Sequence, residues 1–350
     1  MIDSSTFTKE HVLKCAEQFT GVDKILLEKQ IFALSLAQML ASSGLDFVFK
    51  GGTSLILLLE TPLRLSIDVD IIVSPATQLE KFLEFVINNS IFKNIQESER
   101  NQTGKIPKRH YRFHYDSLFN QRFEEYILLD VLFEFPQYPS ILTHSKKNGL
   151  LKYSTDNVSI IKTPTINSIL GDKLTAYAPE TTGIPFYKNG KQMNMEIVKQ
   201  LFDIGVLFDS CDDLAEIKES FTKIALTELY YRDLPSLSPQ DILADIFKTS
   251  KSLLDRDLSN QVFSELNKGI DRLRGYIIGR KFYIEQAIIA AGKAAYLSKL
   301  ILTNSNHIDK YSSPDSNLDN YFVDGEFIKF NKLRKSNPEA FYYWYKAFNL

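Results

Sequence analysis

Cysteine is nearly absent from this chain of 350 residues, which contains only Cys15 and Cys211. Two cysteines so far apart in sequence exclude a disulfide-rich scaffold and a zinc site built on a cysteine cluster. Because such sparse use of cysteine is typical of proteins in a reducing compartment, we expect a cytoplasmic protein.

The chain also lacks a strong net charge of either sign and an uninterrupted apolar run of membrane length. Its 41 Lys and Arg residues nearly balance 43 Asp and Glu residues, so any contact with nucleic acid must use a local basic patch. The first residues show no basic-then-apolar signal pattern, and Lys293 and Lys299 interrupt the apolar run near the C-terminus. We therefore expect neither a secretion signal nor a membrane span.

Residues that build a hydrophobic core are plentiful. Hydrophobic types make up 44% of the sequence, with 25 Phe and 17 Tyr, which is typical of a folded globular protein. Residues 1–165 mix strand-like and helix-like patterns, whereas residues 166–350 show mainly helical spacing. We predict an α+β protein in which a lobe over 1–165, with a small mixed sheet and flanking helices, precedes a mainly helical lobe over 166–350.

The expected elements follow from hydrophobic periodicity and from residues typical of helix and strand ends. The first lobe is predicted to contain helices over 8–43, 53–60 and 78–88, and strands over 46–50, 65–73, 105–115 and 126–135. The second is predicted to contain helices over 166–178, 195–209, 213–231, 239–252, 262–274 and 283–302, then a loop over 304–320.

Two aspartates within an apolar strand are the most informative feature. Asp68 and Asp70 are two residues apart, so in a strand they point to the same face. Adjacent carboxylates repel each other unless a cation joins them, and oxygen ligands suit Mg²⁺. A solvated edge strand is the alternative interpretation.

A third carboxylate is expected from the apolar strand over 126–135. Asp130 and Glu134 lie on one face of that strand, and we favour Asp130 because it is nearer the strand's centre. Carboxylates clustered in this way are suited to metal-assisted phosphoryl or nucleotidyl transfer.

A glycine pair, Gly51 and Gly52, lies between an expected strand and an expected helix. This placement directs helix N–H groups and the positive end of the helix dipole toward an anion. Thr53 or Ser54 could add a hydroxyl contact to a phosphate, and Lys50 could add a positive charge, although a lysine at a strand end is often merely solvated.

Basic residues also share the predicted strands. Arg64 and Ser66 follow the alternation of the two aspartates, so they are expected on the same face, where arginine can hold a triphosphate or form an ordinary salt bridge. The strand over 105–115 alternates basic residues with aromatic ones, which suits either contact with nucleic acid or a charge-protected edge strand. One predicted face of this strand carries Lys108, His110, Arg112 and His114. The other carries Arg109, Tyr111, Phe113 and Tyr115.

These segments resemble a known family. A glycine turn, a helix and a strand with Asp-x-Asp are similar to the nucleotidyltransferase superfamily, and KGGTSL with RLSIDVDI resembles, more closely, the AbiEii/AbiGii toxin family. Leu27-Glu28-Lys29, GDKLTA at 171–176 and KQLFD at 199–203 extend the resemblance over residues 26 to 209. Two positions depart from the family pattern: Tyr177 stands where the family has arginine, and Gln200 where it has aspartate.

The resemblance implies a nucleotidyltransferase fold and a Mg²⁺-dependent enzyme that uses an NTP, with Lys173 and Asp203 completing the site from the helical lobe. Taken without the resemblance, the pattern favours an ordinary role for these two residues: a solvated Lys173, or an ion pair of Lys173 with Asp203 at the junction of the lobes. Family members are toxins of two-gene toxin–antitoxin or phage abortive-infection systems, so an antitoxin encoded nearby is the expected partner. Some relatives transfer nucleotides to the 3′ end of tRNA.

We therefore predict that the protein transfers NMP from an NTP to an acceptor hydroxyl, with the 3′ end of tRNA as the expected RNA acceptor. A protein or small-molecule acceptor, or a degenerate NTP-binding partner module, are the alternatives. The residues predicted to hold metal are Asp68, Asp70 and Asp130. The residues predicted to bind the nucleotide are Lys50, Gly51, Gly52, Thr53, Ser54, Arg64, Ser66 and Lys173. The residues predicted to be catalytic are Asp68, Asp70, Asp130, Lys173 and Asp203.

Overall fold

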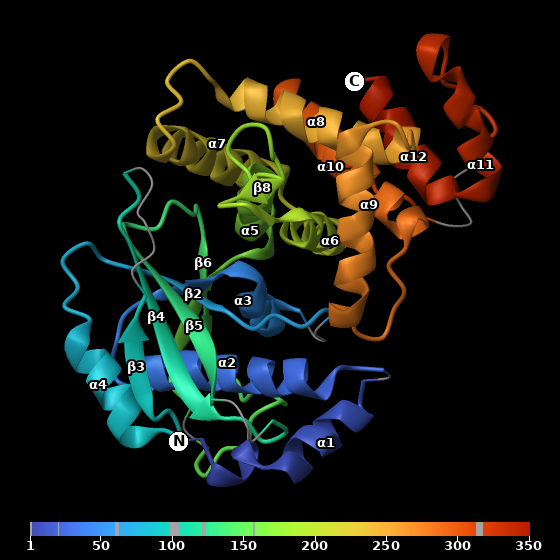
Figure 1. Ribbon diagram of the computed structural model, residues 1–350. Coiled ribbons are helices and arrows are strands. Elements are labelled where there is room, and N and C mark those ends of the chain that lie inside the picture. Colours follow the sequence, from blue (N-terminus) through green and yellow to red (C-terminus); the bar gives the residue numbers. More distant parts are fainter. Residues whose placement is uncertain are drawn as a thin grey trace. The chain divides into compact units, whose positions relative to one another are not determined.

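The chain divides into two compact units (Figure 1). The computed structural model describes residues 2–19, 21–59, 63–98, 105–120, 124–156, 158–312 and 318–350. Unit 1 comprises Met1–Thr165 and Gly275–Arg280, and unit 2 comprises Ile166–Arg274 and Lys281–Leu350. Unit 1 contains a mixed sheet with helices and unit 2 is mainly helical, which confirms the predicted α+β fold.

Unit 1 is built around one mixed β-sheet. Its described strands are ordered β3-β4-β5-β2-β1-β7-β6. The strands are β1 (Val48–Lys50), β2 (Val69–Val73), β3 (Asn94–Glu97), β4 (Lys108–Asp116), β5 (Glu124–Phe133), β6 (Ile141–His144) and β7 (Ile161–Pro164). The helices are η1 (Ser4–Phe7), α1 (Lys9–Glu17), α2 (Lys24–Ser42), α3 (Gly51–Leu58) and α4 (Glu80–Asn89). The short helix η2 (Arg274–Tyr276) leads into Gly275–Arg280, the second segment of unit 1.

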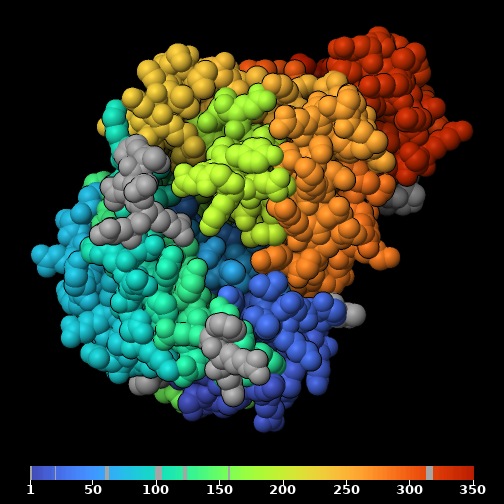
Figure 2. Space-filling model, viewed as in Figure 1, coloured from blue at the N-terminus to red at the C-terminus, as the bar shows by residue number. Residues whose placement is uncertain are grey.

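The register of the central strands aligns four polar residues in one row. Lys50 of β1 lies opposite Asp70 of β2, Asp70 lies opposite Asp130 of β5, and Asp130 lies opposite His110 of β4. Residues directly opposite each other in a sheet point to the same face, so the row forms a single polar strip. Atoms of the β4 and β5 segments, teal to green, form part of the surface of unit 1 (Figure 2).

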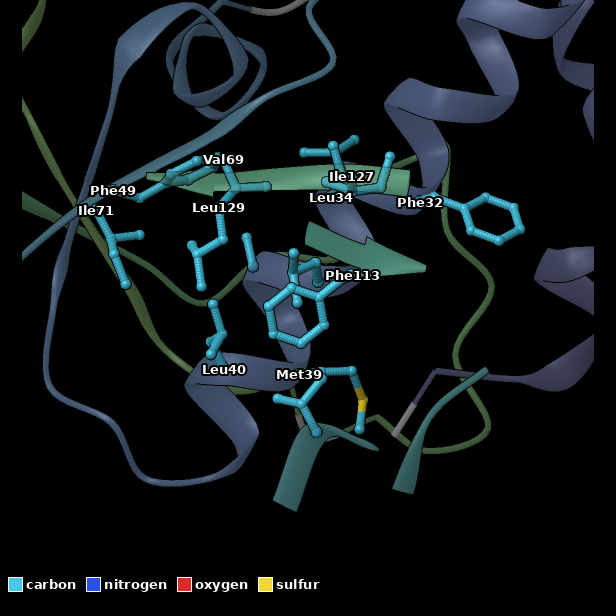
Figure 3. Packing of buried hydrophobic residues seen from close by; sticks show 14 of the residues in the cluster. Phe32, Leu34, Met39, Leu40, Phe49, Val69, Ile71, Phe113, Ile127 and Leu129 are labelled. Atoms are coloured by element: carbon cyan, nitrogen blue, oxygen red, sulfur yellow. The ribbon is translucent and has the colours of Figure 1, made fainter. Parts of the chain in front are cut away.

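The other face of the sheet packs on helix α2 and forms the core of unit 1. Phe32 and Leu40 of α2 and Ile71, Phe113 and Leu129 of the strands are buried in one cluster (Figure 3). Strand residues alternate between faces, so burial of this set leaves the polar row on the opposite face. Helix α2 is long and apolar enough to span a membrane, but 72% of its apolar window is buried inside the protein, as expected of a core helix.

One long helix was predicted over 8–43, and this prediction is wrong because two helices occupy the segment. Gly21 has φ of +76°, a backbone conformation that L-residues with side chains rarely adopt. The Asp23 carboxylate accepts hydrogen bonds from the N–H groups of Ile25 and Leu26 at 2.8 and 3.0 Å, which caps α2 as a new helix.

The predicted strand over 65–73 is wrong in its first four residues, since β2 begins at Val69. The preceding segment pairs instead with a distant part of the chain. Leu65 N–H donates to the Tyr276 carbonyl at 2.7 Å, and Ile278 N–H donates to the Leu63 carbonyl at 3.0 Å. Residues 275–280 thus leave the helical half of the sequence to join unit 1.

The remaining elements of unit 1 differ from expectation mainly at their ends. Strands β3, β6 and β7 were not predicted, because they are four residues long and too short for a clear alternation. Helix α3 begins at Gly51 rather than at residue 53, and Glu60, the predicted last residue, lies outside the described residues.

Unit 2 follows the predicted helical pattern closely. Its elements are α5 (Ile166–Ala176), β8 (Tyr187–Lys188), β9 (Lys191–Gln192), α6 (Asn194–Ser210), α7 (Leu214–Tyr231), α8 (Pro239–Asp255), α9 (Gln261–Leu273), α10 (Ile284–Leu302), η3 (Gly325–Lys332), α11 (Leu333–Ser336) and α12 (Pro338–Phe348). The predicted loop over 304–320 contains no helix or strand where it is described, and residues 313–317 lie outside the described part.

A buried lysine joins three helices of unit 2. Lys293 of α10 is 4% exposed, and its Nζ lies 2.6 Å from Asp209 of α6 and 2.9 Å from Glu339 of α12. Two carboxylates compensate the cost of burying one ammonium group. Nearby, the Trp344 indole donates to the Ile288 carbonyl at 3.1 Å and holds α12 on α10.

Candidate active site

Two of the three predicted metal-site carboxylates are brought together by the pairing of β2 with β5. Asp70 and Asp130 lie directly opposite each other in register, although 60 residues separate them in sequence. Asp68 precedes β2 and is exposed. Glu134, the alternative to Asp130, lies just beyond the last residue of β5. Among the described residues, no three His, Cys, Asp or Glu side chains form a group that could hold a metal ion by themselves.

The Asp70 carboxyl is electrostatically strained. Burial, together with the neighbouring carboxylates of Asp130 and Asp68, raises the pKa of Asp70 to about 7, against the opposing effect of Lys50 and Lys108. A carboxyl group whose charge is opposed by its neighbours is a favourable position for a cation.

We expect replacement of Asp70 by Asn to stabilise the metal-free protein in a pH-dependent way. The folded protein retains a proton on Asp70 between its ordinary pKa of 3.8 and about 7, whereas the unfolded chain releases it, so the wild-type protein loses stability as pH rises through this window. The advantage of the variant should grow from near zero at pH 4 to as much as about 4 kcal/mol above pH 7, at about 1.36 kcal/mol per pKa unit.

Urea denaturation in EDTA at pH 4.5, 6 and 8 measures this difference in the free energy of unfolding. An equal difference at all three pH values would contradict the prediction.

His110 belongs to this site, although the sequence suggested only a role in a nucleic-acid-binding strand. Its Nδ1 lies 2.6 Å from Asp130 Oδ1, with both side chains largely buried. Asp130 therefore has a partner that fixes the position of its carboxylate. The alternation of β4 gave the face of His110 correctly, but no local signal gives the β4–β5 register that sets it opposite Asp130.

Gly51 allows the backbone to approach Asp70 closely. Its φ is +77°, and a Cβ placed on it would lie 2.2 Å from Asp70 Oδ2. No side chain fits in this space. The start of α3 therefore lies against the Asp70 carboxylate, with no protein side chain separating them.

Gly52 gives a second close approach, toward Arg64 and Ser66. A Cβ at Gly52 would lie 2.4 Å from Arg64 Nη2 and 2.7 Å from Ser66 Oγ. The Arg64 side chain is buried, and its Nη1 donates to the Leu65 carbonyl at 3.1 Å. The structure thus brings Arg64 and Ser66 to the first turn of α3, and neither belongs to the strand that was predicted to carry them.

The hydroxyl groups of Thr53 and Ser54 are already used inside the protein. Thr53 Oγ1 donates to the Asp68 carbonyl at 2.5 Å, Ser54 Oγ donates to the Gly51 carbonyl at 2.9 Å, and both side chains are fully buried. In this geometry the two residues fix the first turn of α3 against the segment that carries Asp68. The groups left for an anion at this helix end are backbone N–H groups.

Lys50 is the cation nearest in register to the carboxylates. It lies opposite Asp70 and opposes the rise in the pKa of that residue. Its Nζ lies 5.8 Å from the centre of the Tyr138 ring, a cation–π distance. Lys108 of β4 has the same effect on Asp70, and the sequence did not single it out for the site.

In unit 2, Lys173 and Asp203 form a buried ion pair. Lys173 Nζ lies 2.9 Å from Asp203 Oδ2, with side-chain exposures of 8% and 1%. Lys173 also donates to Gln200 Oε1 at 2.9 Å, so one of the two departures from the family pattern contacts this pair directly. The other, Tyr177, is fully buried, and burial raises the pKa of its phenol.

We expect Lys173→Met to lower the free energy of unfolding by about 3–5 kcal/mol, because it leaves the Asp203 carboxylate buried without its cation. The double variant Lys173→Met, Asp203→Leu should recover most of this loss, since no charge is then left unpaired. Urea denaturation of the two single variants and the double variant measures the coupling. Single variants as stable as the wild type would show that the pair has no structural role.

A separate cavity of about 910 Å³ lies at the ends of β1 and β2 that are away from Lys50 and Asp70. Phe47, Val48, Ile72 and Val73 line it together with Lys81 of α4. None of the predicted site residues lines this cavity. The candidate active site is therefore defined by the polar row and the start of α3 rather than by this hollow.

Comparison with known families assigns the chain to a class. The profile described as "Nucleotidyl transferase AbiEii toxin, Type IV TA system" matches residues 35–272, more than half of the chain. The protein is thus a nucleotidyltransferase. More particularly, it belongs to the AbiEii family of nucleotidyltransferase toxins of type IV toxin–antitoxin systems. The predicted family and enzyme class are confirmed.

Two solved structures show more distant similarity. One is MenT4, a nucleotidyltransferase toxin from Mycobacterium tuberculosis H37Rv, with 13% identity, 96% of this chain and 99% of that chain covered, and a TM-score of 0.46. The other is an antigenic nucleotidyltransferase-like protein from Paracoccidioides brasiliensis, with 15% identity and a TM-score of 0.36; the match covers 60% of this chain and 91% of that chain. No individual curated protein sequence matches the chain significantly.

Proposed function

We propose that the protein transfers NMP from an NTP to the 3′ hydroxyl of an RNA, with tRNA as the expected acceptor, in a Mg²⁺-dependent reaction. The observation that carries this proposal is the pairing of Asp70 with Asp130 in register, next to the start of α3, where two glycines leave the backbone uncovered by side chains of their own. Carboxylates next to free helix N–H groups are the combination that handles a metal-bound triphosphate.

The residues present fit a magnesium ion. Mg²⁺ in phosphoryl-transfer sites is typically held by one or two carboxylates, completed by waters and substrate phosphates rather than by a cage of protein ligands. Asp68 and Asp70 would hold it, with Asp130 as the third oxygen donor, and the raised pKa of Asp70 is consistent with a position that favours a cation. When bound, the ion would neutralise charge on the phosphates and lower the pKa of the attacking hydroxyl.

Nucleotide binding is assigned to the first turn of α3 and the cations around it. The backbone N–H groups at Gly51 and Gly52 would bind phosphate oxygens, and Arg64 and Lys50 would contribute positive charge. Thr53 and Ser54 would act by holding this turn in place, because their hydroxyl groups are bonded internally. Lys173 and Asp203 are assigned to the reaction through the family resemblance.

The proposed reaction forms a bond between the acceptor hydroxyl oxygen and the α-phosphorus, and breaks the bond from that phosphorus to the β-phosphate oxygen. Pyrophosphate leaves. The acceptor hydroxyl, whose pKa the bound ion would lower, gives up its proton to solvent water. His110 would position the Asp130 carboxylate as the third oxygen donor through their 2.6 Å contact.

The biological setting follows from the family. Type IV toxin–antitoxin membership implies an antitoxin partner, which we expect to be encoded beside this gene. We place the reaction in the cytoplasm, where both substrates are present. The two free and buried cysteines are consistent with a reducing compartment.

Incubation with each α-labelled NTP and either total RNA or total protein tests the proposal. We expect label in tRNA-sized RNA, at its 3′ end, and loss of labelling with EDTA that Mg²⁺ restores. Label in protein would overturn the RNA acceptor while retaining the enzyme class. NTP binding without any labelled product would indicate a degenerate binding module.

A further inference from the structure

The face of the sheet that carries Asp130 continues along β4 and β5 beyond the carboxylates. Arg112 lies opposite Leu128, and His114 lies opposite Tyr126. These residues follow His110 and Asp130 at two-residue steps, so their side chains project from the same face. At about 3.3 Å per residue, Tyr126 lies about 13 Å along β5 from Asp130.

Three side chains on this extension form a compact group, which we call the base platform: Arg112, His114 and Tyr126. The Arg112 guanidinium carbon lies 5.0 Å from the centre of the Tyr126 ring. The His114 ring centre lies 5.9 Å from the Tyr126 ring centre, with the planes inclined at 50°. Tyr126 is 42% exposed, and it lies near the start of β5, where the described pairing is with β4 alone because β2 pairs with β5 only from Leu129 onward.

The platform carries unused polar capacity. Arg112 Nε is buried, and within the described ranges it has no hydrogen-bond partner. Arg112 also forms no ion pair with any described residue, unlike Arg109 and His114 on the same strand. His114 Nδ1 lies 3.2 Å from the Glu124 carboxylate at the start of β5. The exposed ring therefore adjoins a guanidinium group that forms no ion pair among the described residues.

Arg109, on the same strand, is an arginine whose guanidinium group is held by ion pairs within the protein, and it serves as a comparison for Arg112. It projects from the opposite face, and its guanidinium donates to Glu97 at 2.8 and 3.0 Å and to Glu80 at 2.9 Å. Both arginines lie over a tyrosine ring, Arg109 at 5.2 Å from the centre of Tyr111 and Arg112 at 5.0 Å from the centre of Tyr126. They differ in that Arg109 pairs with two carboxylates, whereas Arg112 forms no ion pair among the described residues, and its ring partner is exposed. The contrast within one strand argues that Arg112 and Tyr126 do more than protect a sheet edge.

We propose that the base platform binds the single-stranded 3′ end of the RNA acceptor, with a base stacked on Tyr126 and Arg112 contacting that base or its phosphate. Exposed aromatic rings beside arginine are typical of surfaces that bind single-stranded RNA, because every base has a stacking face. The inference rests on the proposed function for its choice of RNA, and it adds the track along which the acceptor approaches Asp130.

The test measures RNA binding without the chemical step. In the Asp70→Asn background, Tyr126→Ala and Arg112→Ala should each weaken binding of a fluorescent six-nucleotide single-stranded RNA with a 3′ hydroxyl by about tenfold, the usual cost of losing one base–aromatic stack. Tyr126→Phe should retain affinity, because the ring remains. NTP binding should be unchanged in all three variants.

Two control variants match the platform residues. Arg109→Ala removes an arginine from the same strand but from the opposite face, and Tyr230→Ala removes an exposed tyrosine of α7 in unit 2. Both should bind the RNA as the parent does. Thermal melting of each variant shows whether any loss of binding follows from unfolding.

Probes with one abasic position, scanned over the four nucleotides nearest the 3′ end, locate the stacked base. At that position, and not at the others, the effect of Tyr126→Ala should vanish. Equal binding by the parent, Tyr126→Ala and Arg112→Ala proteins would overturn the platform, as would equal losses in the Arg109→Ala control. Because these are binding measurements on an inactive variant, a wild-type enzyme that labels protein instead of RNA would be recognised separately in the transfer assay.

Discussion

Replacing Asp70 with asparagine is expected to lower kcat/KM for nucleotidyl transfer by at least about 1,000-fold. The substitution keeps the shape of the side chain but removes the charge that lies opposite Asp130 in the sheet. Stabilisation of transition-state charge by a metal site is worth several kcal/mol, and about 4 kcal/mol corresponds to a thousandfold in rate. Transfer of α-labelled NMP to RNA under single-turnover conditions measures the effect.

Asp116→Asn is the matched control for this variant. Asp116 ends β4, is exposed, and pairs with Lys93 at 2.5 Å, so its loss should change transfer less than about twofold. Because the stability advantage of Asp70→Asn is expected for the metal-free protein, urea denaturation in the Mg²⁺-containing assay buffer checks that its inactivity does not follow from unfolding. Retention of more than a tenth of wild-type activity by Asp70→Asn would refute the assignment of this carboxylate to the reaction.

Gly51→Ala is expected to reduce transfer by at least about 100-fold and to destabilise unit 1. Two effects combine at this position: a φ of +77° and a Cβ that would lie 2.2 Å from Asp70 Oδ2. Either Asp70 or the first turn of α3 must move, and a displacement of about 1 Å in a catalytic site can cost about a hundredfold in rate. Single-turnover transfer and urea denaturation measure the two consequences.

Gly44→Ala separates the clash from the backbone effect. Gly44 has φ of +83°, but a Cβ there would meet no atom within 4 Å. Its substitution should therefore cost only the backbone term of about 1–2 kcal/mol, with transfer by the folded protein unchanged. If Gly44→Ala and Gly51→Ala lose the same activity, close contact between Gly51 and Asp70 is not what the reaction needs.

Features that depend on neighbouring residues were predictable from the sequence. The alternation of β4 gave the correct two faces, with Tyr111 and Phe113 buried and His110 and Arg112 on the polar side. The glycine pair was correctly expected at the start of a helix. Such features were predictable because strand periodicity and glycine conformation are set within a few residues.

Predictions from local sequence pattern were wrong where contacts with distant parts of the chain determine the structure. The apparent strand that included Asp68 begins only at Val69, because Leu63 and Leu65 bond to residues 276–278 of a segment more than two hundred residues away. Likewise, Thr53 and Ser54 have hydroxyl groups suited to phosphate, yet both are bonded to backbone carbonyls within unit 1. No pattern of spacing reveals which partner a hydroxyl group will find.

By itself, the sequence determined the α+β class, the family and the motif KGGTSL with RLSIDVDI. Only the tertiary structure decided that Asp70 meets Asp130, that His110 binds Asp130, and that Lys173 pairs with Asp203 and Gln200. The physical reason is register and packing: strand pairing is chosen by the burial of a whole sheet face, and a buried charge takes whichever opposite charge the fold brings to it.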